Sequence, residues 1–527
     1  MKNFIILLIG LAIFPSCDDF LEKEPTGSPS IAKFWESEDD VDAALAAINN
    51  VMYDGSLDTR NLYYGRPSMW PIAAGDDMVV GKSKSSAQRI HNFEIAGPEK
   101  DIDVLWIRNY LIIKRANDVI INAPEVPGLS QDEVNAALGV AYFYRGMAHF
   151  NVAYRYGNQK MGVPIKDESN TLDFFVERAS HVKDNYDFIA ADLERAADLL
   201  PTLSTAEEGA PHRLAAYAFL TKTYLYWAEY DDTKWASVVT TANKIIGQEG
   251  RALEASYADV FKVVNNYGSE YIWSATGSVN GSGTPIPGQM LENGGYQNGV
   301  AGWGYFHPTE ELYQAFESGD ERLKVTLQEY GDVFTFLGNT MTYASTSSTT
   351  GLQFNKYMDP WCGYADDSQL HPNGDSNPST TLNVPIIRLA DVILMKAEAL
   401  IMQGQNADVE INMIRNRAGL SSLANASLAQ LKNERRVELA GELSDRHFDL
   451  IRWNDAQAVY HQDLHGRSYA ITDPTDPGFD RAAYTLIVPP RTGAARTNFD
   501  PNIHDVWPVP FNEVEISNGT LVQNEGW

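Results

Sequence analysis

Long stretches of this chain place apolar residues at the spacing of one face of an α-helix. Residues 103–121, 131–156 and 185–200 each carry such a face, and Pro201 ends the last of them. Neighbouring stretches are joined by short turns, with Ala and Gly where the helices meet. An apolar stripe stabilises a helix only when it packs against a partner. The pattern predicts a mainly α fold with a tetratricopeptide-like scaffold of helical pairs. A non-repeating α-helical domain is the alternative.

The helical signals fall into two blocks. In the first block we expect helices over residues 41–52, 103–121, 131–156, 185–200, 213–229 and 235–246. The second block begins at Pro385, and there we expect helices over residues 385–404, 407–418, 427–440 and 446–453. Gly404 and Gly419 follow two of these stretches, as is common after the last turn of a helix.

The segment between the blocks, residues 265–380, has a different composition. It is rich in Gly, Ser, Thr and Asn, and helix periodicity fades outside residues 308–318. Residues 270–275 and 333–337 are short β-like runs. A connector of this length inside a compact chain is usually functional or has structure of its own. We therefore expect a loop-rich, partly β subdomain inserted between the helical blocks.

The N-terminus carries the features of a lipoprotein signal. Lys2 is followed by a mostly apolar run over residues 4–14 and then by Cys17. The run is shorter than the about 20 residues that span a bilayer, but it suits a secretory signal. Cleavage before Cys17 would leave a cysteine for acylation, so we expect a lipid-anchored chain. An ordinary secreted protein with an incidental cysteine is the alternative. Cys362 is the only other cysteine, so a lipidated chain forms no internal disulfide.

These signals together predict the organisation of the whole chain. We expect a signal peptide over residues 1–16, a lipid anchor and tether over 17–35, an N-terminal helical block over 36–264, a loop-rich ligand-face subdomain over 265–380, and a C-terminal helical block and tail over 381–527. The tether contains Pro25, Ser28 and Pro29, a composition typical of an extended spacer.

The charge balance excludes one class of partner. The chain has 70 Asp and Glu against 41 Lys and Arg, a formal net charge of −29. Such a surface repels nucleic acid phosphates and anionic lipid headgroups. We therefore expect no nucleic acid partner.

Catalytic and metal-binding motifs are absent from the sequence. It contains no G-x-S-x-G, no H-E-x-x-H and no P-loop. Asp473, Asp476 and Asp480 could hold Ca2+, but a solvated acidic turn is the favoured interpretation, so we expect no cofactor. The dense charges from Glu434 to Arg446 favour a structural ion-pair network over a ligand site.

Aromatic residues in Gly-rich loops form the more specific signal. Aromatic rings offer flat apolar faces to sugar rings, while nearby polar side chains bond the hydroxyls. We expect a non-catalytic ligand site formed by Trp70, Asp77, Arg89, Asn92, Tyr296, Trp303, Tyr305, Trp361 and Tyr364. The alternative is that these aromatic residues pack the loops onto the scaffold.

Several segments, in order along the whole chain, resemble the SusD/RagB family of surface nutrient-binding lipoproteins. They include Arg388, Asp391 and Glu398, and the tail that begins at Trp507 and ends at Trp527. The segments are residues 17–25, 106–117, 141–164, 388–400, 414–419, 434–453 and 507–527.

The resemblance implies both an architecture and a role. It implies an α-helical scaffold with a loop-rich ligand face, lipid-anchored in the outer membrane and facing the cell exterior. It implies a lid that binds an oligosaccharide, breaks no bond in it, and closes over a TonB-dependent, SusC-like transporter barrel. Since some members bind peptides, a peptide- or glycopeptide-binding lid is one rival. A surface glycoside hydrolase with two facing carboxyls and a purely structural adaptor are the others.

Overall fold

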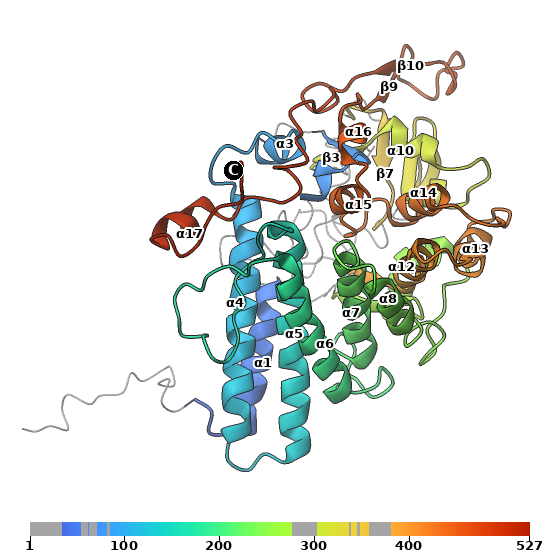
Figure 1. Ribbon diagram of the computed structural model, residues 1–527. Coiled ribbons are helices and arrows are strands. Elements are labelled where there is room, and N and C mark those ends of the chain that lie inside the picture. Colours follow the sequence, from blue (N-terminus) through green and yellow to red (C-terminus); the bar gives the residue numbers. More distant parts are fainter. Residues whose placement is uncertain are drawn as a thin grey trace, which may run out of the picture.

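A row of packed helices forms the body of the molecule (Figure 1). The structure is a computed structural model that describes residues 34–53, 62, 71–81, 85–276, 303–336, 339–344, 348–357 and 381–527. Each helix of the row packs against the next, in the order α1 (Glu38–Tyr53), α4 (Lys100–Asn122), α5 (Gln131–Tyr156), α6 (Val182–Leu199), α7 (Arg213–Trp227), α8 (Lys234–Ala242) and α12 (Leu389–Met402). Beyond this row, α13 (Asp408–Arg417) and α14 (Leu428–Leu439) pack against α12. The mainly α prediction is confirmed.

Local chemistry explains where α5 begins and how closely it packs. The hydroxyl of Ser130 accepts a hydrogen bond from the backbone of Glu133, whose carboxylate bonds back to the amide of Ser130. This capping box satisfies amides that the first helical turn leaves without partners. Further along, a Cβ at Gly146 would lie 2.9 Å from Cγ of Leu193. Glycine is therefore needed at this position for α5 and α6 to approach each other.

The strands form small antiparallel pairs rather than one sheet. The pairs are β1 (Met78–Val80) with β3 (Phe306–Pro308), β2 (Tyr271–Ala275) with β8 (Val384–Arg388), β4 (Leu327–Glu329) with β7 (Leu352–Phe354), β5 (Val333–Phe336) with β6 (Asn339–Thr342), and β9 (Gly466–Tyr469) with β10 (Tyr484–Ile487). The β-like runs predicted at residues 270–275 and 333–337 thus correspond to β2 and β5.

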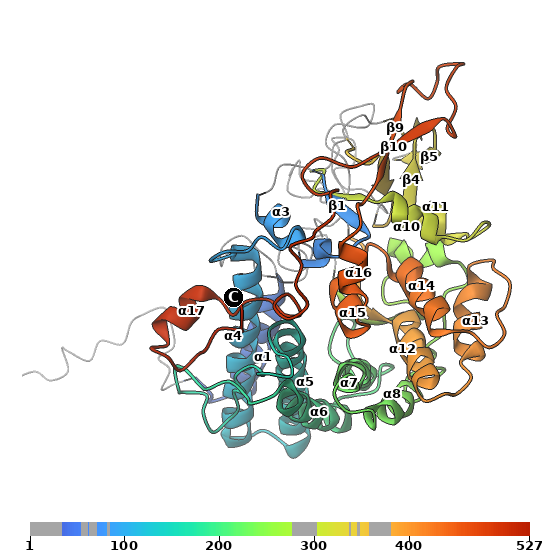
Figure 2. The same cartoon turned by 45° about the horizontal axis from the view of Figure 1, so that its top comes forward.

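Short helices complete the fold. They are η3 (Pro71–Ala74), α3 (Ser85–His91), η4 (Ala123–Glu125), η5 (Tyr257–Phe261), η6 (Val263–Asn265), α10 (Glu310–Ala315), α11 (Arg322–Thr326), α15 (Arg446–Arg452), α16 (Ala456–Tyr460) and α17 (Phe511–Ile516). Figures 1 and 2 place β9, β10 and α10 toward one end of the molecule and the α4–α5 pair toward the other. Across the described ranges, no helix has both the length and the apolar character needed to cross a membrane.

The predicted start of the second helical block is wrong. The second helical block does not begin at Pro385, because residues Val384–Arg388 form strand β8 and helix α12 starts only at Leu389. Strand β8 pairs with β2, with Ser274 opposite Pro385 and Ala275 opposite Val384. Proline lacks a backbone N–H and is disfavoured inside a helix but tolerated at strand edges. The pairing partner lies more than a hundred residues upstream, so local periodicity does not reveal it.

A buried ion-pair network joins the C-terminal helices to the strands beside them. Arg388 forms ion pairs with Glu270 and Glu438 at 2.6 Å each and with Glu442 at 2.7 Å. Arg322 contacts Glu438 at 3.0 Å. These side chains are almost fully buried, so each charge depends on its partners. The structural interpretation of the dense charge cluster is confirmed.

Candidate functional site

The described ranges contain part of the predicted ligand site. Asp77, Arg89, Asn92, Trp303 and Tyr305 lie within them. The predicted ligand residues Trp70, Tyr296, Trp361 and Tyr364 lie outside the described residues, and so does the predicted lipidation site Cys17. The division of the chain into regions also stays a prediction.

The β1–β3 pair positions Asp77 and the two aromatic residues along one short ladder. The amide of Thr309 donates to the carbonyl of Asp77 at 3.0 Å, at one end of the pair. The amide of Gly81 donates to the carbonyl of Tyr305 at 2.8 Å, at the other end. At the strand rise of about 3.3 Å per residue, Asp77 and Tyr305 lie roughly 13 Å apart. The ladder thus brings them to one region but not into contact.

Trp303 and Tyr305 form the aromatic part of the site. Their ring centroids are 5.7 Å apart and their planes are inclined by 33°. Tyr305 is only 8% exposed, whereas Trp303 is half-buried and packs partly against the core. The indole is therefore the more accessible ring, supported by the phenol. An indole held this way offers a flat apolar face to a ligand.

A C-terminal segment ties α3 to the same strand pair. The side-chain amide of Asn92 donates to the carbonyl of Arg491 at 3.1 Å. The hydroxyl of Thr492 accepts from the amide of Val80 at 3.2 Å. Asn92 is therefore held at the side of β1 by residues about 400 positions later in the chain. This placement brings Asn92 to the same strand pair as the aromatic residues.

Arg89 is engaged in a local ion pair at the surface. Its Nη2 lies 2.7 Å from a carboxylate oxygen of Glu99, and its Nε donates to the same oxygen at 2.9 Å. The side chain of Arg89 is 42% exposed, while that of Glu99 is buried. Part of the guanidinium therefore faces solvent, where it could still donate to a hydroxyl.

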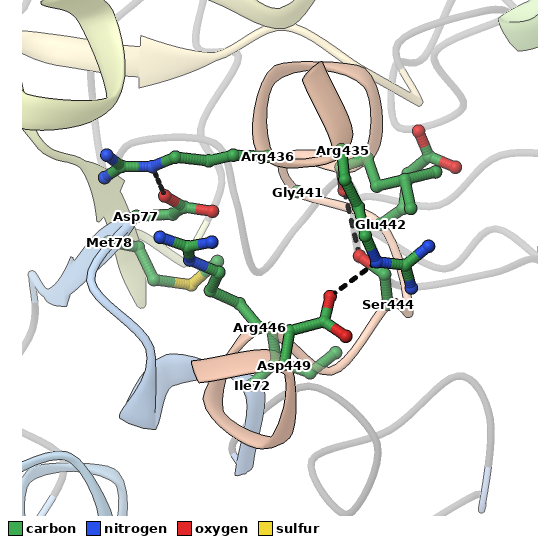
Figure 3. A pocket seen from close by; sticks show the side chains of 11 residues that line it. Ile72, Asp77, Met78, Arg435, Arg436, Gly441, Glu442, Ser444, Arg446 and Asp449 are labelled. Atoms are coloured by element: carbon green, nitrogen blue, oxygen red, sulfur yellow. Dashed lines mark hydrogen bonds and ion pairs between the residues drawn. The ribbon is translucent and has the colours of Figure 1, made fainter. Parts of the chain in front are cut away.

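Asp77 belongs to a buried cluster of carboxylates and arginines (Figure 3). Nε of Arg436 donates to Asp77 at 2.6 Å, and Nε of Arg446 donates to the neighbouring Asp76 at 2.8 Å. Burial raises the pKa of Asp77, although Arg436 opposes the shift. Burial acts the same way on Asp76, but Arg436 and Arg446 outweigh it and hold the pKa of that carboxyl well below its usual range.

The cavity at this cluster is small. Its volume is about 10 Å³, and it is lined by Asp77, Arg435, Arg436 and Arg446 among others. A space of this size holds about one water molecule. The charged groups around Asp77 therefore face one another rather than an open ligand surface, and the ligand role of Asp77 stays a prediction.

A buried histidine on the same strand pair, His307, could not be identified from the sequence. His307 lies on β3, and the amide of Thr349 donates to its Nδ1 at 3.0 Å. Burial lowers the pKa of His307 to about 4, so the imidazole is neutral near pH 7. A Cβ at Gly81 would lie 2.3 Å from Cε1 of His307, so only glycine fits there. The sequence carries no signal that Gly81 and His307 are neighbours, because only the β1–β3 pairing brings these two residues together.

The acidic turn considered for calcium has internal partners. Asp473 accepts hydrogen bonds from the amide and hydroxyl of Thr475, and Asp476 and Asp480 each accept from an amide two residues later. Within the part of the chain that the structure describes, no group of three or more Asp, Glu, His or Cys could hold a metal ion.

Comparisons with known proteins agree with this architecture. A sequence model described as the SusD family matches residues 269–527, and one described as "Starch-binding associating with outer membrane" matches residues 19–225. A SusD-like protein of Bacteroides ovatus is 26% identical over 482 residues, which covers 86% of this chain and 83% of that protein. A SusD-like protein of Formosa agariphila is 26% identical over 508 residues, covering 87% and 93%.

Solved structures share the fold. A SusD-like protein from Bacteroides fragilis superposes with a TM-score of 0.76 at 21% identity, covering 94% of this chain and 99% of that one. Surface glycan-binding protein A from Bacteroides thetaiotaomicron, in complex with laminarihexaose, gives a TM-score of 0.71 at 18% identity, covering 92% and 99%. With family models matching residues 19–225 and 269–527 and this fold, the chain belongs to the SusD/RagB family.

Proposed function

We propose that this protein is a lipid-anchored lid that captures oligosaccharides at the cell surface and delivers them to a TonB-dependent outer-membrane transporter. SusD family proteins bind their ligands without catalysis, so the chain is not an enzyme. The lipid is carried by Cys17, and the protein lies on the exterior side of the outer membrane.

The half-buried indole of Trp303, backed by Tyr305, is the observation that carries this proposal. The ring pair is fixed at the end of the β1–β3 ladder. The indole side chain therefore loses little conformational entropy when a ligand binds. Asn92 lies at the same strand pair, and its side-chain amide can donate a hydrogen bond to a hydroxyl or accept one from it. The flat apolar ring can stack on the C–H face of a sugar, while polar neighbours bond its hydroxyls.

The oligosaccharide class draws support from structural relatives. A neighbour with a TM-score of 0.71 was solved with laminarihexaose, and another, with a TM-score of 0.69, is a laminarin-binding SusD-like protein. These names describe what those proteins bind. For this chain they make neutral glucans the first ligands to test.

A peptide-binding lid is the second candidate function, favoured by one observation. A groove of about 380 Å³ runs beside α4 and is lined by Trp106, Tyr110 and Phe174 among others. Leu172 at its edge is 91% exposed and Phe174 is 86% exposed. Exposed large apolar side chains at a groove favour a protein or peptide ligand over a sugar.

A binding screen separates the two candidates. The soluble form lacking residues 1–17 is applied to a glycan array and to a peptide array of matched length. We expect binding to one class of neutral glycan, and co-purification of the lipidated full chain with a barrel protein from outer membranes. Binding to peptides alone would overturn the glycan assignment, and a lipidated chain that extracts without a barrel would overturn the transporter role.

A further inference from the structure

A further cleft lies beside strand β2, and neither Trp303 nor Tyr305 is among the residues that line it. Its volume is about 310 Å³, within the range of small-molecule sites in proteins. It is lined by the loop between α6 and α7, by residues of β2, and by Glu249, Arg251 and Tyr267. The cleft therefore has side chains from three separate segments around it.

A hydrogen bond and a close backbone approach define how the loop lies at the cleft. The amide of Leu203 donates to a carboxylate oxygen of Glu249 at 2.6 Å. At the other end, Gly209 has φ +82°, and a Cβ there would lie 3.3 Å from the hydroxyl of Tyr267. Only glycine adopts this conformation at so close an approach without strain. The cleft is therefore shaped by the fold before any ligand enters.

His212 contributes a buried acceptor to this cleft. Its Nε2 lies 2.8 Å from the carbonyl of Ile272, and since a carbonyl only accepts, Nε2 carries the proton. Burial lowers the pKa of His212 to about 4, so the ring is neutral near pH 7 and Nδ1 has a lone pair. The residue is only 5% exposed, and among the described residues Nδ1 has no hydrogen-bond partner.

Arg251 contributes a donor beside that acceptor. Its Nη1 donates to the carbonyls of Gly268 and Tyr271 at 2.7 Å each. Its buried Nε–H finds no acceptor in the described part of the chain. The positive charge of Arg251 adds to the lowering of the pKa of His212, so the guanidinium lies near the imidazole, and both side chains line the cleft.

The free acceptor of His212 and the free donor of Arg251 indicate which kind of ligand the cleft can hold. An unpaired acceptor next to an unpaired donor is satisfied by two neighbouring hydroxyls, one donating to His212 and one accepting from Arg251. Glu207 and Glu208 at the cleft disfavour an anion. We propose that this cleft is a second carbohydrate site, which holds one neutral sugar ring through a pair of vicinal hydroxyls. The sugar class rests on the proposed function, but the cleft itself does not involve Trp303.

Saturation-transfer NMR on the soluble chain from Asp18 to Trp527 tests this site. The probes are D-glucose, D-galactose and D-mannose, with tetrahydropyran as the same ring without hydroxyls. We expect a signal from at least one sugar and none from tetrahydropyran. Ala206 lines the cleft, and Ala206→Trp fills it. Ala236→Trp, at an exposed position on α8, is the matched control. Trp303→Ala should retain a signal. In the Trp303→Ala background, Ala206→Trp should abolish that signal and Ala236→Trp should retain it.

A second variant probes the acceptor itself. His212→Gln keeps a nitrogen donor toward Ile272 but loses the imidazole lone pair, and we expect about fivefold weaker sugar binding. A signal lost in Trp303→Ala alone would leave the proposed function standing and overturn the second site. A signal lost in Ala206→Trp alone supports the second site even if Trp303 proves dispensable. No sugar signal, or one insensitive to Ala206→Trp in the Trp303→Ala background, would also overturn it.

Discussion

Replacing Arg388 by methionine should strongly destabilise the fold. Arg388 is 1% exposed and donates at 2.6–2.8 Å to Glu270, Glu438 and Glu442. Methionine fills much of the same volume but leaves these buried carboxylates with less compensating charge. Breaking a buried ion pair by removing one partner costs about 3–5 kcal/mol. We expect Arg388→Met to lower the free energy of unfolding by that amount.

Urea denaturation followed by circular dichroism measures this loss. The control is Lys114→Met, which removes a pair with Asp118 in which the lysine side chain is 55% exposed. An exposed pair of this kind contributes below about 1 kcal/mol. The midpoint of Arg388→Met should therefore fall far below that of Lys114→Met. Equal midpoints for the two variants would refute the claim that the buried network stabilises the C-terminal helices.

Two further perturbations test smaller parts of the account. Burial, together with the negative charges of Glu99, Glu513 and Asp101, raises the pKa of Asp103 from its usual 3.8 to about 7. Between these two pH values the folded state holds a proton on Asp103 that the unfolded state has released. Stability should therefore fall as pH rises through this window, and Asp103→Asn should be more stable than wild type at pH 8 but not at pH 4 in urea titrations; equal curves would contradict this. Gly419 has φ +76° and a Cβ there would lie 3.0 Å from Glu321, whereas Gly404 has φ +69° with open space around it. Gly404→Ala should cost about 1–2 kcal/mol in thermal melts and Gly419→Ala more, and the reverse order would contradict the steric argument.

Helices with a strong apolar face were predictable from local sequence. The stretch at residues 103–121 corresponds to α4, and the stretch at 131–156 corresponds to α5. Periodicity carries this information because each helix buries its own face against a sequential neighbour. Strand β8 was not predictable, since its pairing with β2 depends on residues far away in the chain.

In the candidate site, too, only features that are local in the sequence could be predicted. The aromatic pair of Trp303 and Tyr305 was visible as a composition signal, and the structure brings their rings within 5.7 Å. The partner of Asp77 was not visible, because Arg436 lies 359 positions later in the chain. His212 was also missed, since a lone histidine between two helices carries no pattern until β2 is placed beside it.

The affinity of the soluble protein for an oligosaccharide, measured in parallel for wild type, Trp303→Ala and Trp303→Phe, tests the central claim most directly. Loss of stacking on an accessible indole should weaken binding at least tenfold in Trp303→Ala, with partial recovery in Trp303→Phe and a melting temperature close to that of wild type. Unchanged affinity in Trp303→Ala would contradict the claim, and so would a loss of affinity that simply follows a loss of folding.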